Sequence, residues 1–347
     1  MKDILCCYSI ILFIGIIYGE PCKSWSQPRV WAVPGSKVGI YLKSDSNLGN
    51  KKVYAVSPSL PMKKIIMKEK STGFYYGEVT LKKTGLYIFY FPSLNNRKEK
   101  VTIEISERKN KYREALERNI MWFINSGIMP KEDGHDGIWE RYVISRNNFS
   151  HHKRPDCHFQ TSLLLYLYSQ FANKRYYKEI SENLVNYIWS NNFQYMDKKK
   201  DSYGAYRWSN IYADRWIDDN SWVTLVSLKL YCLNRDKEYF RRGMLTAGWI
   251  ERIRDEKTGL LPIKEENPGC KRWAGLSWRP HWAGPGWMAL AVAGKVGEKR
   301  KYVDWAIKGI KVLYRKWKEK PFDTNNAGCL LFQLAGIYHL SGDGELR

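Results

Sequence analysis

The stretch YADRWIDDNSWVTLVSLKLY, residues 212–231, decides the fold of this chain. Its first half holds aromatic, arginine and aspartate side chains, and its second half is largely apolar. Acidic and small polar residues ahead of an apolar run mark a helix start, so the pattern predicts a helix over 219–233. Asp218 and Asp219 then stand where this helix begins, and Asp218 could equally be its N-cap.

Similar helical patterns occur on both sides of this stretch. Apolar residues three and four positions apart place Tyr112, Leu116 and Ile120 on one stripe, and Gly127 ends that helix. Further helices are predicted over 157–171, 174–189, 237–255, 285–293, 299–317 and 325–340. About eight helices therefore follow one another in antiparallel hairpins, and the long polar loops between them gather at one face, where function is expected.

The chain before residue 108 has a different period. Short runs rich in Val, Ile and Tyr alternate with turn residues, which predicts strands over 37–42, 51–56, 74–81, 86–91 and 100–105. The last of these runs resemble the final strands of an immunoglobulin-like sandwich. We therefore predict a multidomain chain: a signal peptide over 1–19, a small β-sandwich module over 25–106 and an all-α domain over 108–347.

The first residues predict export. Lys2 precedes an almost wholly apolar run from Ile4 to Tyr18, and Gly19 supplies a small residue for cleavage. The run is shorter than the about 20 apolar residues that cross a bilayer, and no later segment is long and apolar enough to span one. We expect a secreted, periplasmic or cell-surface protein, and an uncleaved N-terminal anchor is the alternative.

The formal net charge of +22 has three interpretations. It could attract nucleic acid or an acidic polysaccharide, or it could reflect a composition rich in Lys, Ile, Asn and Tyr throughout. The lysines are scattered rather than massed in one basic arm, which favours the compositional interpretation and argues against a nucleic-acid partner. Aromatic residues make up 15% of the chain, and tryptophans in loops could stack on the faces of sugar rings.

Metal and cofactor motifs do not stand out. Of seven cysteines, Cys6 and Cys7 leave with the predicted signal, and the remaining odd number includes no C-x-x-C pair, which argues against a dense disulfide framework and a cysteine zinc site. Asp133, His135 and Asp136 fit no metal-binding spacing. The chain also lacks a glycine-rich phosphate loop, a Ser-His-Asp signature and an H-E-x-x-H motif, so no cofactor is expected.

Several segments of this sequence resemble those of a known family. The stretch over 212–231, together with DGHDGIWERY, RPDCHFQTSLLLYLY, SWRPHWAGPGWMALAVAG and NNAGCLLFQLAG, resembles the loop and inner-helix segments of six-hairpin glycosidases. The resemblance covers residues 108–340 and implies an (α/α) toroid fold and a carbohydrate substrate. A full toroid of six hairpins has more helices than this chain is predicted to have, so the ring could be incomplete, or long loops could replace helices.

Glycoside hydrolysis requires two carboxyl groups on either side of the scissile bond. Asp218 and Asp219 are the first choice, and the other candidates are Asp156, before an apolar helix, and Glu140, in a loop rich in Gly, His and Trp. Asp156 could point into the same cleft as Asp219, because both begin predicted inner helices, or it could only cap its helix. His158 could be catalytic or could serve as a hydrogen-bonded structural residue.

A second segment, GLSWRPHWAGPGW over 275–287, gathers aromatic and basic residues. Arg279 could hold a carboxylate through a bidentate pair, and His281 could act as an acid or base. A rigid loop packed with aromatic side chains is the alternative. The residues predicted to bind substrate are Asp136, Trp139, Trp216, Trp222, Trp278, Arg279, His281, Trp282 and Trp287.

Three functions follow from these features. The first is an exported glycoside hydrolase that cleaves a poly- or oligosaccharide with paired carboxylates. The second is a polysaccharide lyase on a uronic-acid polymer, which needs a Tyr or His base and a group that neutralises the uronate. The third is an envelope protein that binds a glycan without cleaving it. Fold alone does not choose among them.

Overall fold

The computed structural model describes residues 24–26, 30–32, 37–44, 54–55, 65–66, 68–71, 74–90, 100–105, 111–143, 146, 148–265, 273–319 and 324–343. The chain divides into two compact units. The helical unit comprises Ile124–Leu164 and Ile180–Arg347, and the strand unit comprises Cys22–Phe123 and Leu165–Glu179. The predicted signal peptide over 1–19 lies outside the described residues.

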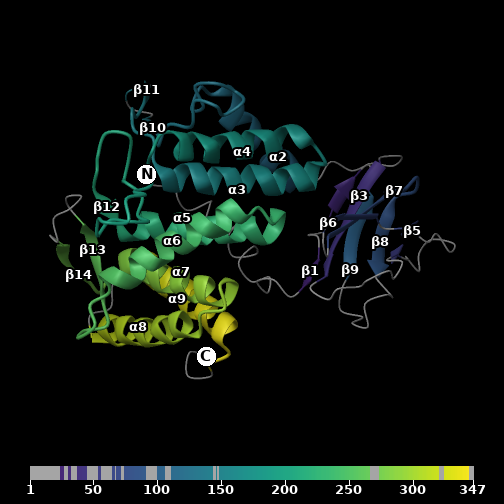
Figure 1. The fold of residues 1–347 in the computed structure, drawn as a ribbon. Helices are drawn as coiled ribbons and strands as arrows, with labels where there is room; N and C mark the ends of the chain where they lie inside the picture. Colours follow the sequence, from purple (N-terminus) through teal and green to yellow (C-terminus); the bar gives the residue numbers. More distant parts are fainter. Residues whose placement is uncertain are drawn as a thin grey trace. The chain divides into compact units, whose positions relative to one another are not determined.

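The described residues are mostly helical, as predicted. The helices are α2 (Lys111–Asn125), α3 (Pro155–Ala172), α4 (Arg175–Ser190), α5 (Ile217–Asn234), α6 (Lys237–Ile253), α7 (Pro280–Val296), α8 (Arg300–Glu319) and α9 (Thr324–Ser341). Each corresponds to one predicted helix. Short turns join α5 to α6 and α7 to α8, so these helices run as antiparallel hairpins (Figure 1).

Helix α7 differs most from its prediction. The helix begins at Pro280, five positions before the predicted start, and Pro285 lies inside it. Proline suits the first helical position because the N–H that it lacks would have no partner there. Pro285 removes only one further helical bond near that end. The segment predicted as a loop therefore forms the first turns of α7.

The described residues of the strand unit form three small sheets. One has the order β1-β3-β7-β6 and another the order β2-β9-β8, while β4 pairs with β5. Their bounds are β1 (Ser24–Ser26), β2 (Val30–Ala32), β3 (Lys37–Ser44), β4 (Tyr54–Ala55), β5 (Ile65–Ile66), β6 (Lys68–Ser71), β7 (Phe74–Thr80), β8 (Gly85–Tyr90) and β9 (Lys100–Ile105). Every predicted strand run overlaps one of these strands. The immunoglobulin-like sandwich itself stays a prediction.

The helical unit also holds short strands that the sequence did not predict. β10 (Tyr142–Val143) pairs with β11 (Asn148–Phe149), and β12 (Arg215–Trp216), β13 (Leu261–Glu265) and β14 (Trp273–Ser277) form a sheet in that order. β12 leads directly into α5, and β14 leads into α7. This sheet therefore lies at the end of the unit where those two helices begin (Figure 1).

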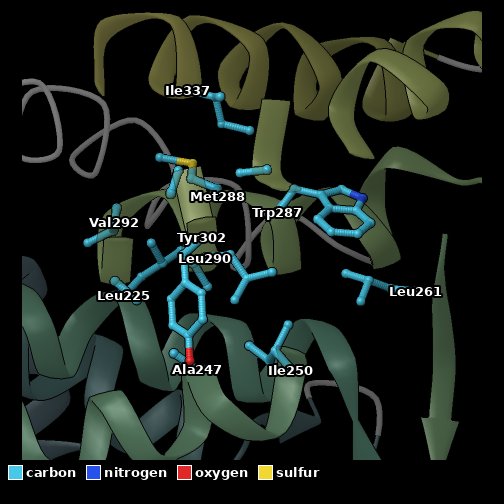
Figure 2. Close-up of a cluster of buried hydrophobic side chains, with 14 of the residues drawn as sticks. Leu225, Ala247, Ile250, Leu261, Trp287, Met288, Leu290, Val292, Tyr302 and Ile337 are labelled. Carbon is cyan, nitrogen blue, oxygen red and sulfur yellow. The ribbon is translucent and has the colours of Figure 1, made fainter. Parts of the chain in front are cut away.

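Helix α7 lies in the core of the helical unit. Its residues from Ala289 to Ala293 are buried on all sides of the helix, and it packs against α5, α8 and α9. Figure 2 shows Trp287, Met288 and Leu290 among apolar side chains of these helices and of α6. Trp287 has no exposed surface. Its prediction as a substrate-binding residue is wrong, because its ring fills the core.

Three of the cysteines lie among the described residues. Cys157 carries a free thiol. Among the described residues no helix combines the length and apolar character needed to cross a membrane.

Candidate active site

One arginine binds three carboxylates near the helix ends. Arg154 donates through Nη1 to Glu140 Oε1 at 2.8 Å and through Nη2 to Asp219 Oδ1 at 2.5 Å. Its Nε and Nη2 also donate to the two carboxylate oxygens of Asp156, at 3.1 and 3.0 Å. Asp218 interacts electrostatically with Arg154 and Asp156. We call Glu140, Asp156, Asp218 and Asp219 the acid cluster.

Three backbone segments bring the acid cluster together. Asp156 lies in the first turn of α3, and Asp218 and Asp219 lie in the first turn of α5. The β10–β11 hairpin folds the chain back, so that the Glu140 N–H donates to His152 O at 2.8 Å. The four residues predicted as catalytic are therefore neighbours, although their roles stay a prediction.

The aspartates that begin these helices are not N-caps. Helix α5 begins at Ile217 with Trp216 as its N-cap, so Asp218 lies inside the first turn. Helix α3 begins at Pro155, so Asp156 also lies inside its helix. The capping interpretation of both residues is wrong, and the Asp156 carboxylate binds Arg154 instead.

Burial raises the pKa of the adjacent aspartate pair. Burial raises the pKa of Asp218 to about 6, with Arg154 opposing this shift and Asp156 adding to it. Burial also raises the pKa of Asp219 well above its usual value, and the charges of Asp156 and Asp218 add to that effect. One guanidinium does not compensate four carboxyl groups, so the pair retains a proton under mildly acidic conditions.

Glu140 and Arg154 stay charged. Burial alone would raise the pKa of Glu140, but hydrogen bonds from Arg141 and Arg154 outweigh burial and hold that pKa below its usual value. Burial disfavours the Arg154 cation, yet the charges of Asp156 and Asp219 prevail and raise its pKa. The acid cluster thus combines the ionised Glu140 carboxylate with an aspartate pair of raised pKa, as acid–base chemistry requires.

An aromatic group lies beside the acid cluster. The Arg154 guanidinium lies 5.4 Å from the centre of the Trp208 ring, which is 5.2 Å from Tyr212 and 6.3 Å from Trp216. His152 contacts Trp208 and Tyr212 at 5.7 and 5.4 Å between ring centres. Because Tyr212 is 47% exposed, the group presents ring surface to solvent next to buried acids. Such surfaces suit the faces of sugar rings.

Hydrogen bonds to the backbone fix the position of the aromatic group relative to the acid cluster. The Lys153 N–H donates to Asn210 Oδ1 at 2.8 Å, and the Asn210 N–H donates to Lys153 O at 3.1 Å. The Asn220 side chain bonds both the N–H and the C=O of Tyr206, at 2.6 and 3.0 Å. The loop between 206 and 216 is therefore fixed against the segment before α3 and against the start of α5.

Two residues predicted to bind substrate are engaged within the protein. The Lys153 ammonium lies 4.5 Å from the centre of the Trp139 ring and 4.7 Å from that of Tyr187. The same ammonium donates to Asp136 O at 2.5 Å, and the Asp136 carboxylate pairs with Lys131 at 3.2 Å. One face of Trp139 is thus covered by a cation, which leaves less of the ring for a sugar.

His158 has a structural role. It is fully buried, its Nε2 accepts from the Ile138 N–H at 2.9 Å, and its Nδ1 bonds Arg154 O at 2.7 Å. Only a neutral ring protonated on Nδ1 satisfies both bonds. Burial lowers the pKa of His158 to about 3. Gly137 has φ +73°, and a Cβ there would collide with the ring, so this turn requires glycine.

The basic residues of the second predicted segment are exposed near the start of α7. The Arg279 guanidinium lies 5.1 Å from the centre of the partly buried Trp282 ring. The His281 side chain is also exposed. The backbone N–H of His281 donates to Asn326 Oδ1 at 3.3 Å. These residues stand at the end of the helical unit where α7 begins, and their substrate contacts stay a prediction.

The other predicted tryptophans pack against neighbouring helices. Trp278 is partly buried against the core, and Trp222 stacks on Phe332 of α9 with 6.4 Å between ring centres. Both side chains keep some exposed surface, unlike Trp287.

The sequence predictions missed Arg154, His152, Trp208 and Tyr212. Arg154 directly precedes Pro155, Asp156 and an apolar helix. A cation next to an acid at a predicted helix start could have indicated its role. The three aromatic residues follow no period, because they lie in loops that are brought together only by tertiary contacts.

The described residues offer no site for a metal ion. No group of three or more His, Cys, Asp or Glu side chains in this part of the chain is arranged to hold one. The Arg154 guanidinium takes the centre of the acid cluster instead.

The fold is that of (α/α)-toroid proteins. A solved structure described as a possible member of the GH105 family, from Salmonella enterica serovar Paratyphi A, matches with a TM-score of 0.50 and 18% identity. The match covers 67% of this chain and 66% of that chain. The predicted toroid-type helical fold is confirmed at this level, and an identity this low shows the fold alone.

Other solved structures are less similar. A polysaccharide lyase matches with a TM-score of 0.47 and 12% identity, over 93% of this chain and 46% of that chain. A family 76 glycoside hydrolase from a bovine Bacteroides thetaiotaomicron strain has a TM-score of 0.45 and 9% identity, over 91% of this chain and 85% of that chain. The chain thus spans less than half the length of that lyase. No family model and no curated protein matches the chain.

Proposed function

We propose that this protein is an exported glycoside hydrolase whose acid cluster cleaves a poly- or oligosaccharide. One observation carries the proposal: four carboxyl groups converge on Arg154, and burial raises the pKa of two of them. A carboxyl group that keeps its proton can protonate the glycosidic oxygen, and an ionised neighbour can attack or stabilise the cationic sugar. The toroid fold agrees with this class without selecting it.

The roles follow from the hydrogen bonds. Asp219 accepts from Arg154 through Oδ1, which leaves Oδ2 to carry the proton that reaches the leaving group. Asp156 is the partner whose charge raises the pKa of Asp219. Asp218 adds to that effect, and its Oδ1 is buried without a hydrogen-bond partner in the described part of the chain. Arg154 holds the carboxyl groups in place, and Tyr212 and Trp216 contact the sugar.

Export and domain organisation complete the proposal. The N-terminal charge and apolar run support secretion, and the segments over 25–106 and 108–347 are assigned as a β-sandwich module and the catalytic domain. A glycosidase that acts on a polymer outside the cell needs such an export signal.

A polysaccharide lyase is the second candidate, and a specific pair of residues favours it. His152 and Tyr212, the residue types that serve as lyase bases, lie with their ring centres 5.4 Å apart. A lyase must also neutralise a uronate, and Arg154, the cation at this position, is already bound by three carboxylates. A guanidinium occupied in this way has little capacity for a substrate carboxylate, which favours hydrolysis.

The test is the release of reducing ends from a panel of neutral and acidic polysaccharides. We expect Asp219→Asn to keep the fold and to lower the rate by at least a hundredfold, while the exposed Asp197→Asn serves as a matched control with unchanged activity. New ultraviolet absorbance from an unsaturated product would establish the lyase instead. Full turnover in Asp219→Asn would contradict the assignment of Asp219 as a catalytic residue. Glycan binding without any product would instead support the third function, a protein that binds a glycan without cleaving it.

A further inference from the structure

Positive charge is concentrated on one helix. Helix α8 carries seven basic and two acidic side chains in 20 residues. The whole chain has 57 basic residues among 347, so α8 has roughly twice the average density. The neighbouring α9 has no Asp, Glu, Lys or Arg at all. Helix α8 is therefore a local concentration of basic side chains in a chain whose lysines are otherwise scattered.

The basic residues of α8 lie on its outward face. The opposite face is buried and apolar, and it packs mainly against α7. Lys301, Lys308 and Arg315 are exposed and follow at intervals of seven residues. Seven residues make almost two full turns, so the three side chains point in nearly the same direction, about 10.5 Å apart along the axis. We call these three residues the basic row.

Two members of the basic row are available to a ligand. Lys308 and Arg315 form no ion pair within the described ranges. Lys301 pairs with Glu251 at 3.0 Å and lies 5.2 Å from the centre of the partly exposed Trp305 ring. A neutralised first cation and two unpaired ones leave a net positive strip along most of the helix.

We propose that the outward face of α8 binds an acidic polysaccharide outside the acid cluster. The basic row extends over about 21 Å, which suits a polymer with repeated anionic groups better than one small anion. The exposed Tyr314 adds ring surface beside the cations. The apolar side of α8 is buried in the core, so the helix lacks the exposed apolar face with which an interfacial helix enters a membrane.

The direction of α8 links this surface to the acid cluster. The three-residue turn between α7 and α8 makes the two helices antiparallel, so α8 ends where α7 begins. Arg315 is therefore the member of the basic row at the end of the unit that holds the β12–β13–β14 sheet (Figure 1). A bound polymer would extend toward the end that carries the acid cluster. The choice of a glycan as the polyanion rests on the proposed function.

The test compares two charge reversals in the full chain. Lys308→Glu with Arg315→Glu alters the basic row, and Lys198→Glu with Lys199→Glu makes the same change of net charge in an exposed loop. Binding to polygalacturonate is measured by calorimetry at low and at moderate salt, with dextran as the uncharged polymer. We expect the first variant to bind at least tenfold more weakly, with a shallower salt dependence, and the second to change by less than threefold.

Each other outcome overturns the proposal. Equal losses in the two variants would mean that net charge alone drives binding. Tighter binding of the wild-type protein to a DNA duplex or to phosphatidylglycerol vesicles would assign the surface to another partner, and an absence of polygalacturonate binding would remove it. Asp219→Asn should bind polygalacturonate as tightly as the wild type. A failure of the hydrolase proposal would therefore appear as missing product with binding intact.

Discussion

Arg154 Nη2 binds Asp219 Oδ1 at 2.5 Å, although 65 positions separate the two residues in the sequence. The contact joins the start of α3 to the start of α5, and both side chains are largely buried. Since Arg154 also binds Asp156 and Glu140, the guanidinium is the counterion that permits three carboxylates to share one buried location. Its removal should therefore affect stability more than the loss of a surface ion pair.

Arg154→Met should lower the free energy of unfolding by about 3–5 kcal/mol at pH 7, because it leaves buried carboxylates without a counterion. The loss should shrink at pH 4.5, where the carboxyl groups can take up protons. Urea denaturation at both pH values measures it. The control is Arg141→Met: the Arg141 side chain is 62% exposed, so its ion pair with the buried Glu140 is expected to contribute about 0–1 kcal/mol. Equal destabilisation at the two pH values would contradict this account.

Asp218 and His158 should give opposite pH dependence to stability. The folded pKa of Asp218, about 6, lies above its usual value, so the folded state binds more protons between pH 4 and 6 and stability falls as the pH rises. The folded pKa of His158, about 3, lies below its usual value, so stability rises with pH over the same range. The two effects partly cancel in the wild type.

Single variants should separate these effects. In Asp218→Asn the Asp218 contribution, which lowers stability as the pH rises, is lost, so the free energy of unfolding should rise more steeply from pH 4 to 6 than in the wild type. In His158→Gln the slope should change in the opposite direction. Urea denaturation at pH 4, 5 and 6 provides the comparison. Parallel curves for the three proteins would show that neither group titrates as its surroundings imply.

Local patterns predicted the helices and the four acids, because neighbouring residues determine the helix period and the signals of a helix start. The pairing of Asp219 with Arg154 is a tertiary contact, and no local pattern contains it. Trp287 was misassigned for a related reason. An aromatic residue near glycines and prolines suggests a loop whose ring stacks on a sugar. In the structure, α7 continues through this segment and the ring is buried.

Asp218→Asn should also shift the pH profile of hydrolysis. The charge of Asp218 helps to raise the pKa of Asp219, so its removal should lower that pKa and move the basic limb of kcat/KM to lower pH. Initial rates across the pH range measure this limb. An unmoved basic limb would assign the proton donor to another group.

Gly309 should tolerate no side chain. It lies on α8 directly against Trp287, and a Cβ there would collide with the indole ring. Gly309→Ala is expected to cost about 1–3 kcal/mol, because the packed core cannot yield without distortion. Gly328→Ala on α9 is the matched control: nothing lies within 4 Å of its Cβ, and alanine favours a helix by about 0.5–1 kcal/mol over glycine. Thermal unfolding distinguishes the two signs.

The acid cluster also predicts the stereochemistry of hydrolysis. Asp219 Oδ1 and Asp156 Oδ2 both bond to Arg154 Nη2, at 2.5 and 3.0 Å, so they lie closer together than the sum of these distances. Retaining glycosidases place their carboxyl groups about 5–5.5 Å apart, whereas inverting enzymes need about 6.5–9.5 Å to admit a water molecule. Under the proposed function, Asp156 is assigned as the nucleophile and Asp219 as the proton donor of a retaining enzyme. Proton NMR of the first product should show the anomer of the substrate, and Asp156→Ala should regain activity with azide as an external nucleophile. Release of the opposite anomer would assign catalysis to a different pair of groups.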